Sequence, residues 1–109
     1  MILAGVVGRT VGGGRDGMLA FLHDALFDRI GMRSAVPEFD AAGTFLGGAF
    51  VWATAQDWAR FGLLFLRDGV WDGARVLPAG WVDYVRQPAP APNNGVYGAH
   101  VWLNLEPKG

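Results

Sequence analysis

Apolar side chains recur at three- and four-residue spacing between positions 16 and 30, the pattern of a helix with one buried face. The apolar positions are Met18, Leu19, Leu22, Leu26 and Ile30. Asp16 stands where an N-cap is expected, and Gly31 stands where helices commonly end. A weaker helical period covers residues 1–11. The run Gly12-Gly13-Gly14 predicts its end, because glycines lose much backbone entropy in a helix.

The clearest helix signal follows Thr54, which has Asp57 three residues later. This is the spacing of a capping box, with Asp in place of the usual Glu or Gln. Apolar residues then recur up to Asp68-Gly69, where the helix is predicted to end. Because few positions are clearly polar, we expect this helix to be enclosed on most sides. Gly62 in its interior costs about 1 kcal/mol relative to alanine and predicts close approach of another backbone.

Between and after these helices the pattern is broken. Residues 32–48 have no helical period and predict short extended pieces and turns. Trp71-Asp72-Gly73 marks a turn, and Pro78 stands where a short helix is expected to begin. That helix is predicted to have one apolar face, formed by Trp81, Val82 and Val85.

The last part of the chain predicts a linker, a turn and a strand. Pro88, Pro90 and Pro92 predict a stiff linker, and Asn93-Asn94-Gly95 predicts a turn. Residues 97–103 alternate in the manner of a strand that has no evident pairing partner. Such an unpaired edge is unusual in a complete domain. The whole pattern predicts an α+β chain, mostly helical, with a few short strands.

Composition narrows the classes of function. Hydrophobic residues make up 51% of the 109 residues and charged residues 17%, which favours a packed core over disorder. The net charge is −1 and the charges are scattered singly, which argues against nucleic-acid binding. The absence of cysteine excludes disulfides and thiolate metal sites. The apolar run over residues 1–7 is too short for a membrane span and lacks the features of a signal peptide. We predict no metal and no cofactor.

The segment Gly12-Gly13-Gly14-Arg15-Asp16-Gly17 has the form G-x-G-x-x-G, and Glu38 follows about twenty residues later. A dinucleotide site of this kind requires a preceding strand and a surrounding βαβ unit. Neither is predicted, so we favour a glycine linker between two helices.

Three side chains are candidates for other chemistry. His23 has Asp24 and Asp28 near it in sequence but no third ligand at a suitable spacing, so a solvent-exposed histidine is favoured over a metal site or proton relay. His100 is expected to be a partly exposed strand residue, with the lining of a pocket as the alternative. Ser34 is the one serine in the chain, with no lysine three residues later and no glycine elbow. We interpret it as a loop serine, and the chain offers no catalytic constellation.

Longer stretches resemble the beta-lactamase-related serine hydrolases, which include class C beta-lactamases, penicillin-binding-protein-like esterases and 6-aminohexanoate-dimer hydrolases. The family patterns are a helix end "L-F-x-x-x-G-M", a helix "A-T-x-x-D-x-A-R-F-G" and a segment "D-G-x-W-x-G-x-R-x-L-P-x-G-W-V". The matching residues here are Leu26-Phe27 with Ile30-Gly31-Met32, then Ala53 to Gly62, then Asp68 to Val82, preceded by the glycine-containing turn Gly43 to Gly48. The resemblance covers roughly residues 1–103 in consistent order.

The resemblance implies a partial serine beta-lactamase-like (DD-peptidase-like) fold. It implies a parent enzyme that hydrolyses an ester or amide bond (lactam, peptide or oligoamide) through an acyl-enzyme. The family's S-x-x-K serine and Y-x-N-like tyrosine would precede Met1, and its K-T-G or H-x-G segment would follow Gly109. His100 does not match that segment, because no glycine follows it two residues later. We therefore expect residues 1–109 to be one incomplete domain that is inactive alone.

Seven residues are candidates for the wall of the parent's cleft: Phe45, Gly47, Gly48, Phe50, Trp52, His100 and Trp102. No catalytic role transfers to them, and packing is the favoured interpretation of the aromatic residues. The resemblance implies a bacterial periplasmic or cytoplasmic protein. The aromatic load predicts self-association. Two alternatives remain: a self-standing helical module that binds a partner through a tryptophan-rich surface, and a nucleotide-binding fragment.

Overall fold

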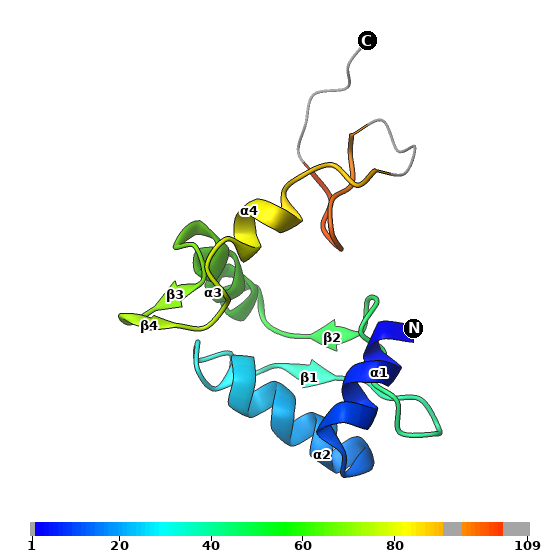
Figure 1. Ribbon diagram of the computed structural model, residues 1–109. Coiled ribbons are helices and arrows are strands. Elements are labelled where there is room, and N and C mark those ends of the chain that lie inside the picture. The colour runs from blue at the N-terminus through cyan, green and yellow to red at the C-terminus, as the bar shows by residue number, and fades with distance from the viewer. Residues whose placement is uncertain (1, 91–94, 104–109) are drawn as a thin grey trace. The chain divides into compact units, whose positions relative to one another are not determined.

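The computed structural model describes residues 2–90 and 95–103. The chain divides into two units, Met1–Leu64 and Phe65–Gly109. The first unit contains α1 (Ile2–Val11), α2 (Gly14–Leu22), a π-helical turn (His23–Phe27), β1 (Val36–Pro37), β2 (Val51–Trp52) and most of α3 (Ala55–Leu66). The second contains β3 (Val70–Trp71), β4 (Ala74–Arg75) and α4 (Trp81–Val85). Four helices and two small antiparallel sheets within the described residues confirm the α+β class (Figure 1).

The glycine run forms the connection between α1 and α2, which pack against each other. Gly12 and Gly13 adopt left-handed conformations (φ 78° and 75°), which favour glycine. A Cβ atom at Gly17 would collide with the carbonyl oxygen of Gly12, so this position also requires glycine. Gly12 and Gly13 form the expected helix–helix linker, and the rest of the motif is the first turn of α2. The helix α1 stands where a dinucleotide motif requires a strand, so the dinucleotide interpretation is wrong.

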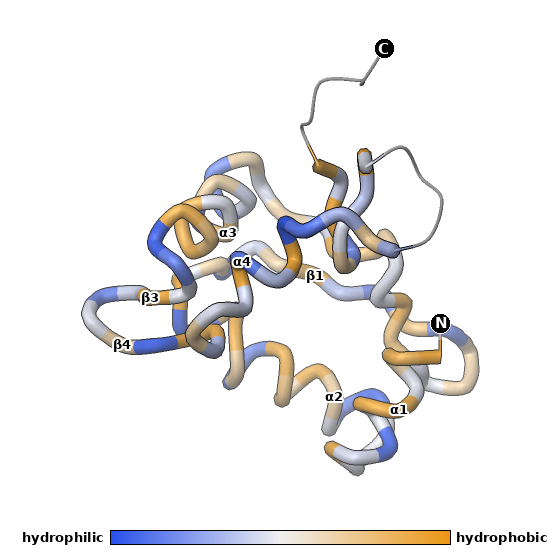
Figure 2. The backbone as a smooth tube through the Cα atoms, turned by 45° about the horizontal axis from the view of Figure 1, so that its top comes forward, coloured by the Kyte–Doolittle hydropathy of each residue, from blue (hydrophilic) through white to orange (hydrophobic). Residues whose placement is uncertain are grey.

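The start of α2 differs from the prediction. The helix begins at Gly14 with the left-handed Gly13 as its cap, and no side chain caps it. Asp16 lies inside the first turn, so its prediction as the N-cap is wrong. Its negative charge still lies where the helix dipole favours it. The hydrophilic residues of α2, Arg15 and Asp16, lie at its start, and hydrophobic residues follow from Met18 to Leu22 (Figure 2).

The helical course continues through a π-helical turn and ends at Gly31, as predicted. The Asp28 N–H donates to the carbonyl of His23 at 2.9 Å, five residues back. Gly31 has a φ of 73°, and the Met32 N–H donates to the carbonyl of Phe27 at 2.9 Å, closing the end in the manner of a Schellman motif. The largest fully buried side chains are those of Ile30, Met32 and Leu64.

Residues 36–52 fold back on themselves without helix, as predicted. β1 and β2 are antiparallel, with Val36 opposite Trp52, and an isolated bridge joins Phe39 to Phe45. Asp40 closes the turn between Phe39 and Phe45. Its Oδ1 accepts hydrogen bonds from the N–H groups of Ala42 and Thr44, both at 2.9 Å. The segment Gly43 to Gly48 is therefore part of a closed loop.

α3 begins after Thr54, as predicted, but it is not enclosed. Its buried residues are Asp57 and Leu64, whereas Trp58 is 41% exposed and Leu66 is 82% exposed. A Cβ atom at Gly62 would meet open space, so the predicted close approach of another backbone is also wrong among the described residues. The apolar composition of α3 predicts that the helix is buried, but it does not specify which residues pack against it. Part of its apolar surface is exposed in this structure.

In the second unit, β3 and β4 form a hairpin around Asp72 and Gly73, both at positive φ (48° and 78°), which confirms the predicted turn. α4 begins at Trp81 after a left-handed Gly80, three residues later than the helix start expected at Pro78. Val82 and Val85 are buried, but Trp81 is 41% exposed and stacks on Tyr84 at a ring distance of 5.5 Å. Trp81 therefore does not belong to the buried face.

Residues 97–103 do not form the predicted strand. Tyr97 lies opposite Trp102 in an antiparallel bridge, and the Gly98 N–H donates to the carbonyl of Val101 at 2.9 Å. The chain reverses between them, with His100 at a φ of 63°. Residues of one predicted strand are thus each other's pairing partners. Pro92 and the predicted turn residues Asn93 and Asn94 lie outside the described residues.

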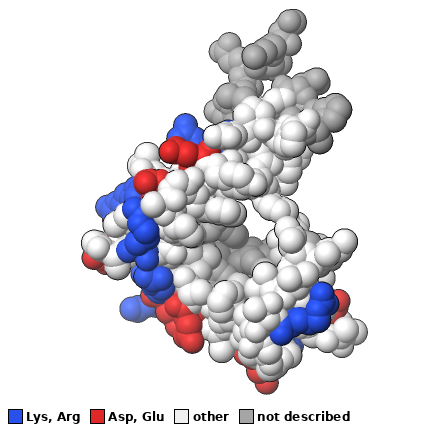
Figure 3. Space-filling view, in the orientation of Figure 1, with Lys and Arg blue, Asp and Glu red and all other residues white. Residues whose placement is uncertain are grey.

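The helices of the described residues are consistent with the prediction of no membrane span. Within the described ranges, no helix combines the length and the apolar character that crossing a membrane requires. On the face in view in Figure 3, both acidic and basic side chains are present.

Candidate functional site

The cleft candidates predicted from the sequence do not form one group. Phe45 lines a pocket in the first unit, and a Cβ atom at Gly47 would lie 3.1 Å from the Phe45 ring and 3.6 Å from the Cβ of Ala4, another lining residue. Gly48, Phe50 and Trp52 are exposed and do not line this pocket. His100 and Trp102 belong to the second unit. The structure therefore brings together Phe45 and Gly47.

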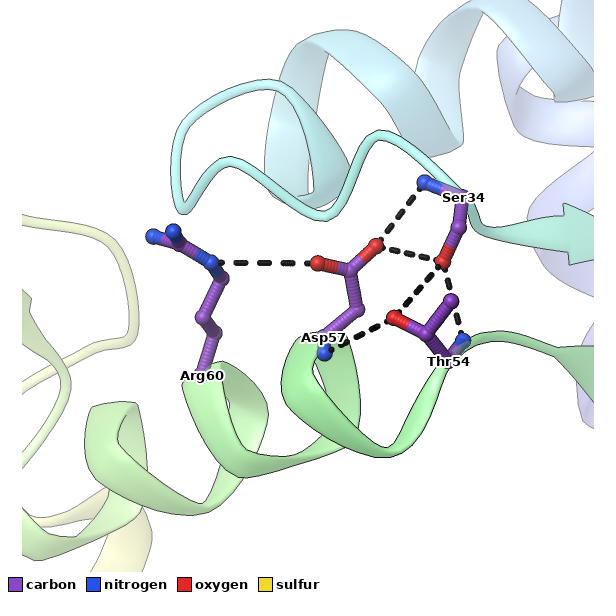
Figure 4. Close-up of polar contacts among 4 residues, drawn as sticks. All are labelled: Ser34, Thr54, Asp57 and Arg60. Carbon is purple, nitrogen blue, oxygen red and sulfur yellow. Dashed lines mark hydrogen bonds and ion pairs between the residues drawn. The ribbon is translucent and has the colours of Figure 1, made fainter.

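Ser34 is the centre of a hydrogen-bonded junction that the sequence did not predict (Figure 4). Its Oγ donates to Asp57 Oδ2 at 2.5 Å and accepts from the Thr54 N–H at 2.9 Å. Its own N–H donates to the same Asp57 oxygen at 2.8 Å. The serine thus ties the segment after Gly31 to the first turn of α3.

The capping box at this helix start is shared between two segments. Thr54 Oγ1 accepts from the Asp57 N–H at 3.2 Å, which is the predicted N-cap bond. The reciprocal bond is made by Ser34 Oγ, which takes the Thr54 N–H in place of the Asp57 carboxylate. The signal in the sequence that could have indicated the role of Ser34 is the Asp at position 57, since its side chain is shorter than the Glu or Gln of the usual capping box.

Arg60 completes the junction (Figure 4). Its Nε lies 3.7 Å from Asp57 Oδ1, one helical turn along α3. The guanidinium also lies against Gly31, where a Cβ atom would approach Arg60 to 3.3 Å. The hydroxyl and the N–H of Ser34, and then the charge of Arg60, hold the pKa of Asp57 below its ordinary value, although burial opposes this.

The junction does not have the chemistry of a serine nucleophile. An activated serine needs a base that takes its proton and a third group that orients the base. Ser34 donates directly to a carboxylate whose pKa is lowered, and such a carboxylate is a weak base. The arrangement fixes two chain segments to one another.

The pocket has a volume of about 290 Å³ and is formed by α1, the start of α2 and the loop over residues 42–45. Most of its lining is small or apolar: Ala4, Gly5, Gly8, Gly12, Gly14, Met18, Ala42, Gly43 and Phe45. The polar side chains in the lining are those of Arg9 and Thr44. This combination of apolar walls and few polar groups is typical of a small-molecule site.

His23 forms a pair with Asp28, whose Oδ1 lies 3.0 Å from its Nδ1. The π-helical turn makes this contact possible, since residues five apart do not face each other on a regular α-helix. The His23 ring also packs edge-on against Phe27, with ring centres 5.5 Å apart. Across the described part of the chain, no group of three His, Asp or Glu side chains is arranged to hold a metal ion.

Comparisons with models of protein families, with curated proteins and with solved structures found no match to this chain.

Proposed function

We propose that this chain is a segment of a beta-lactamase-related serine hydrolase, in which it supports one side of the substrate cleft without supplying a catalytic residue. The parent enzyme cleaves an ester or amide bond through an acyl-enzyme. The observation that supports the proposal is a contact between two separate stretches of the family pattern, in which Gly31 lies against the guanidinium of Arg60.

In the first two stretches, the pattern residues make specific contacts. Gly31 of the "L-F-x-x-x-G-M" stretch lies against Arg60 of the "A-T-x-x-D-x-A-R-F-G" stretch. Thr54 caps the helix, and the spacing of Asp57 and Arg60 places their charges one turn apart. These contacts give the pattern residues structural roles, which is what a supporting segment requires.

In the third stretch, the pattern residues form the hairpin of β3 and β4. A Cβ atom at Gly69 would lie 2.7 Å from the Cβ of Leu77, and Gly73 supplies the turn. The guanidinium of Arg75 donates to the carbonyl of Asp68 at 3.0 Å and to that of Leu77 at 3.1 Å. The "D-G-x-W-x-G-x-R-x-L" residues thus have structural roles, which agrees with a supporting segment.

The proposal is tested by expressing the chain with its native flanking sequence and, separately, as the 109 residues alone. We expect the longer protein to hydrolyse p-nitrophenyl acetate or nitrocefin, and the short chain to remain at background. A fluorophosphonate probe, located by mass spectrometry, should label a serine outside residues 1–109. Ser34→Ala in the longer protein is the matched control and should keep both labelling and turnover.

Three results would overturn it: labelling of Ser34, turnover by the short chain, or an inactive longer protein that is folded. The last result would favour the second candidate, a module that binds a partner through exposed aromatic residues. The observations behind that candidate are the exposed fractions of Trp52 (60%) and Trp102 (80%).

A further inference from the structure

We propose that the pocket between α1, α2 and the loop over residues 42–45 binds a small apolar carboxylate, with Arg9 as the residue that recognises the carboxylate. This inference does not depend on the proposed hydrolase, because every lining residue belongs to this chain.

The size of the pocket limits the ligand to a small molecule. Its volume of about 290 Å³ is at the lower end of the range for ligand pockets. The volume exists because α1 presents Gly5 and Gly8 to it, and a Cβ atom at Gly8 would meet open space. Larger side chains at these positions would fill it.

The walls select an apolar body for the ligand. Ala4 and Met18 are buried and give the pocket an aliphatic floor. Phe45 gives it an aromatic wall, and the Phe45 ring packs against the ring of Phe39, with ring centres 5.9 Å apart. The guanidinium of Arg15 lies 5.3 Å from the centre of the Phe39 ring, and Arg15 is not among the residues that line the pocket.

The charge selects an anionic head group. Arg9 is the charged residue in the lining, and its guanidinium folds back along α1 toward Gly5, where a Cβ atom would lie 3.6 Å from it. The nearby carboxylate of Asp40 is bound to the N–H groups of Ala42 and Thr44 and does not line the pocket. An arginine binds a carboxylate with two parallel hydrogen bonds, so a single guanidinium is sufficient for this group.

The test uses three probes of equal length: hexanoate, hexanol and hexylammonium. Each is titrated into the 15N-labelled chain, and amide shifts are followed by NMR. We expect saturable shifts at Gly5, Gly8 and Thr44 with hexanoate, weaker binding of hexanol and none of hexylammonium. Arg9→Met should weaken hexanoate binding roughly fivefold, the size expected for one solvent-exposed charge pair, and Arg9→Lys should recover part of it.

A second variant separates the pocket from the charge. Gly8→Leu places a side chain in the pocket at a helical position that accepts it, so it should abolish hexanoate binding without loss of helix. Gly62→Leu is its matched control, since a Cβ atom at Gly62 also meets open space but lies away from the pocket, and it should bind normally. Equal binding of hexylammonium, unchanged binding by Arg9→Met, or retained binding by Gly8→Leu would each overturn the proposal.

Discussion

At the scale of single residues, Ser34 acts as a donor and an acceptor at the same time. Its hydroxyl donates to Asp57 and accepts from the Thr54 N–H, and its backbone N–H adds a second bond to Asp57. A hydrogen bond to a charged group contributes more to stability than one between neutral groups. Removing one partner also leaves the other group without a hydrogen bond, which costs further free energy. The one serine of this chain is therefore a residue on which two segments depend.

Ser34→Ala should lower the free energy of unfolding by roughly 1–2 kcal/mol, because both hydroxyl bonds are lost while the backbone bond to Asp57 remains. Urea denaturation of the chain followed by circular dichroism measures the change. Thr10→Ala is the matched control, since Thr10 Oγ1 donates to a carbonyl of its own helix, that of Val6, and should change the stability little. Equal effects of the two substitutions would contradict the role assigned to Ser34.

The lowered pKa of Asp57 predicts a specific acid sensitivity. The folded state holds the Asp57 proton less tightly than the unfolded chain, so the unfolded state binds more protons and stability rises with pH. The contribution is complete above the ordinary pKa of 3.8 and is lost as the pH falls through the lower pKa of the folded state.

The difference in free energy of unfolding between the wild type and Asp57→Asn should therefore become smaller as the pH is lowered from 6 to 2. The reason is that the asparagine has no proton to gain. Denaturant unfolding curves at each pH measure this difference. Asp83→Asn serves as the control, because Asp83 is an exposed carboxylate in α4 and lies outside the junction. Parallel curves for wild type and Asp57→Asn across this range would mean that the junction does not act on Asp57.

At the scale of elements, α1 and α2 each contain a glycine, and the two glycines have different structural roles. Gly17 is required because the backbone of Gly12 lies against it, whereas Gly8 faces open space within a helix. Substitution of alanine at the two positions can be compared directly. Both are glycines within helices, and the substitution adds the same methyl group at each.

Gly17→Ala should destabilise the chain by about 2 kcal/mol or more, because the methyl group collides with a backbone carbonyl that has no rotamer to adopt. Gly8→Ala should stabilise it by roughly 0.5–1 kcal/mol through helix propensity. Thermal unfolding of both variants beside the wild type gives the comparison. If Gly17→Ala leaves the stability unchanged or raises it, the close contact between Gly17 and the Gly12 carbonyl is not required for the stability of the chain.

At the scale of the whole molecule, large apolar side chains remain exposed in both units. Ile2 is 85% exposed, Leu66 82% and Trp102 80%. Scattered apolar residues on a surface are ordinary, but this many large ones in a short chain favour association. This agrees with the proposed role as a supporting segment, whose exposed faces would contact the rest of the parent protein.

Sedimentation of the isolated chain should accordingly show a mass that rises with concentration. Trp102→Gln should weaken the association by about tenfold, the loss of one aromatic anchor in an interface. Gln56→Ala, an exposed position at the start of α3, should leave it unchanged. A constant monomer mass up to the limit of solubility would contradict this expectation.

The sequence by itself determined the local elements whose signals lie within a few residues of one another. The cap at Thr54, the helix end at Gly31 and the hairpin at Asp72-Gly73 each depend on backbone conformations that neighbouring residues decide. Contacts between distant segments were decided by the tertiary structure alone. Residues 97–103 alternate like a strand, but a left-handed His100 turns them back on themselves. The bond from Ser34 to Asp57 joins residues 23 positions apart, and the pocket joins α1 to the loop at Phe45. No local pattern encodes such pairings, because they depend on where whole elements pack.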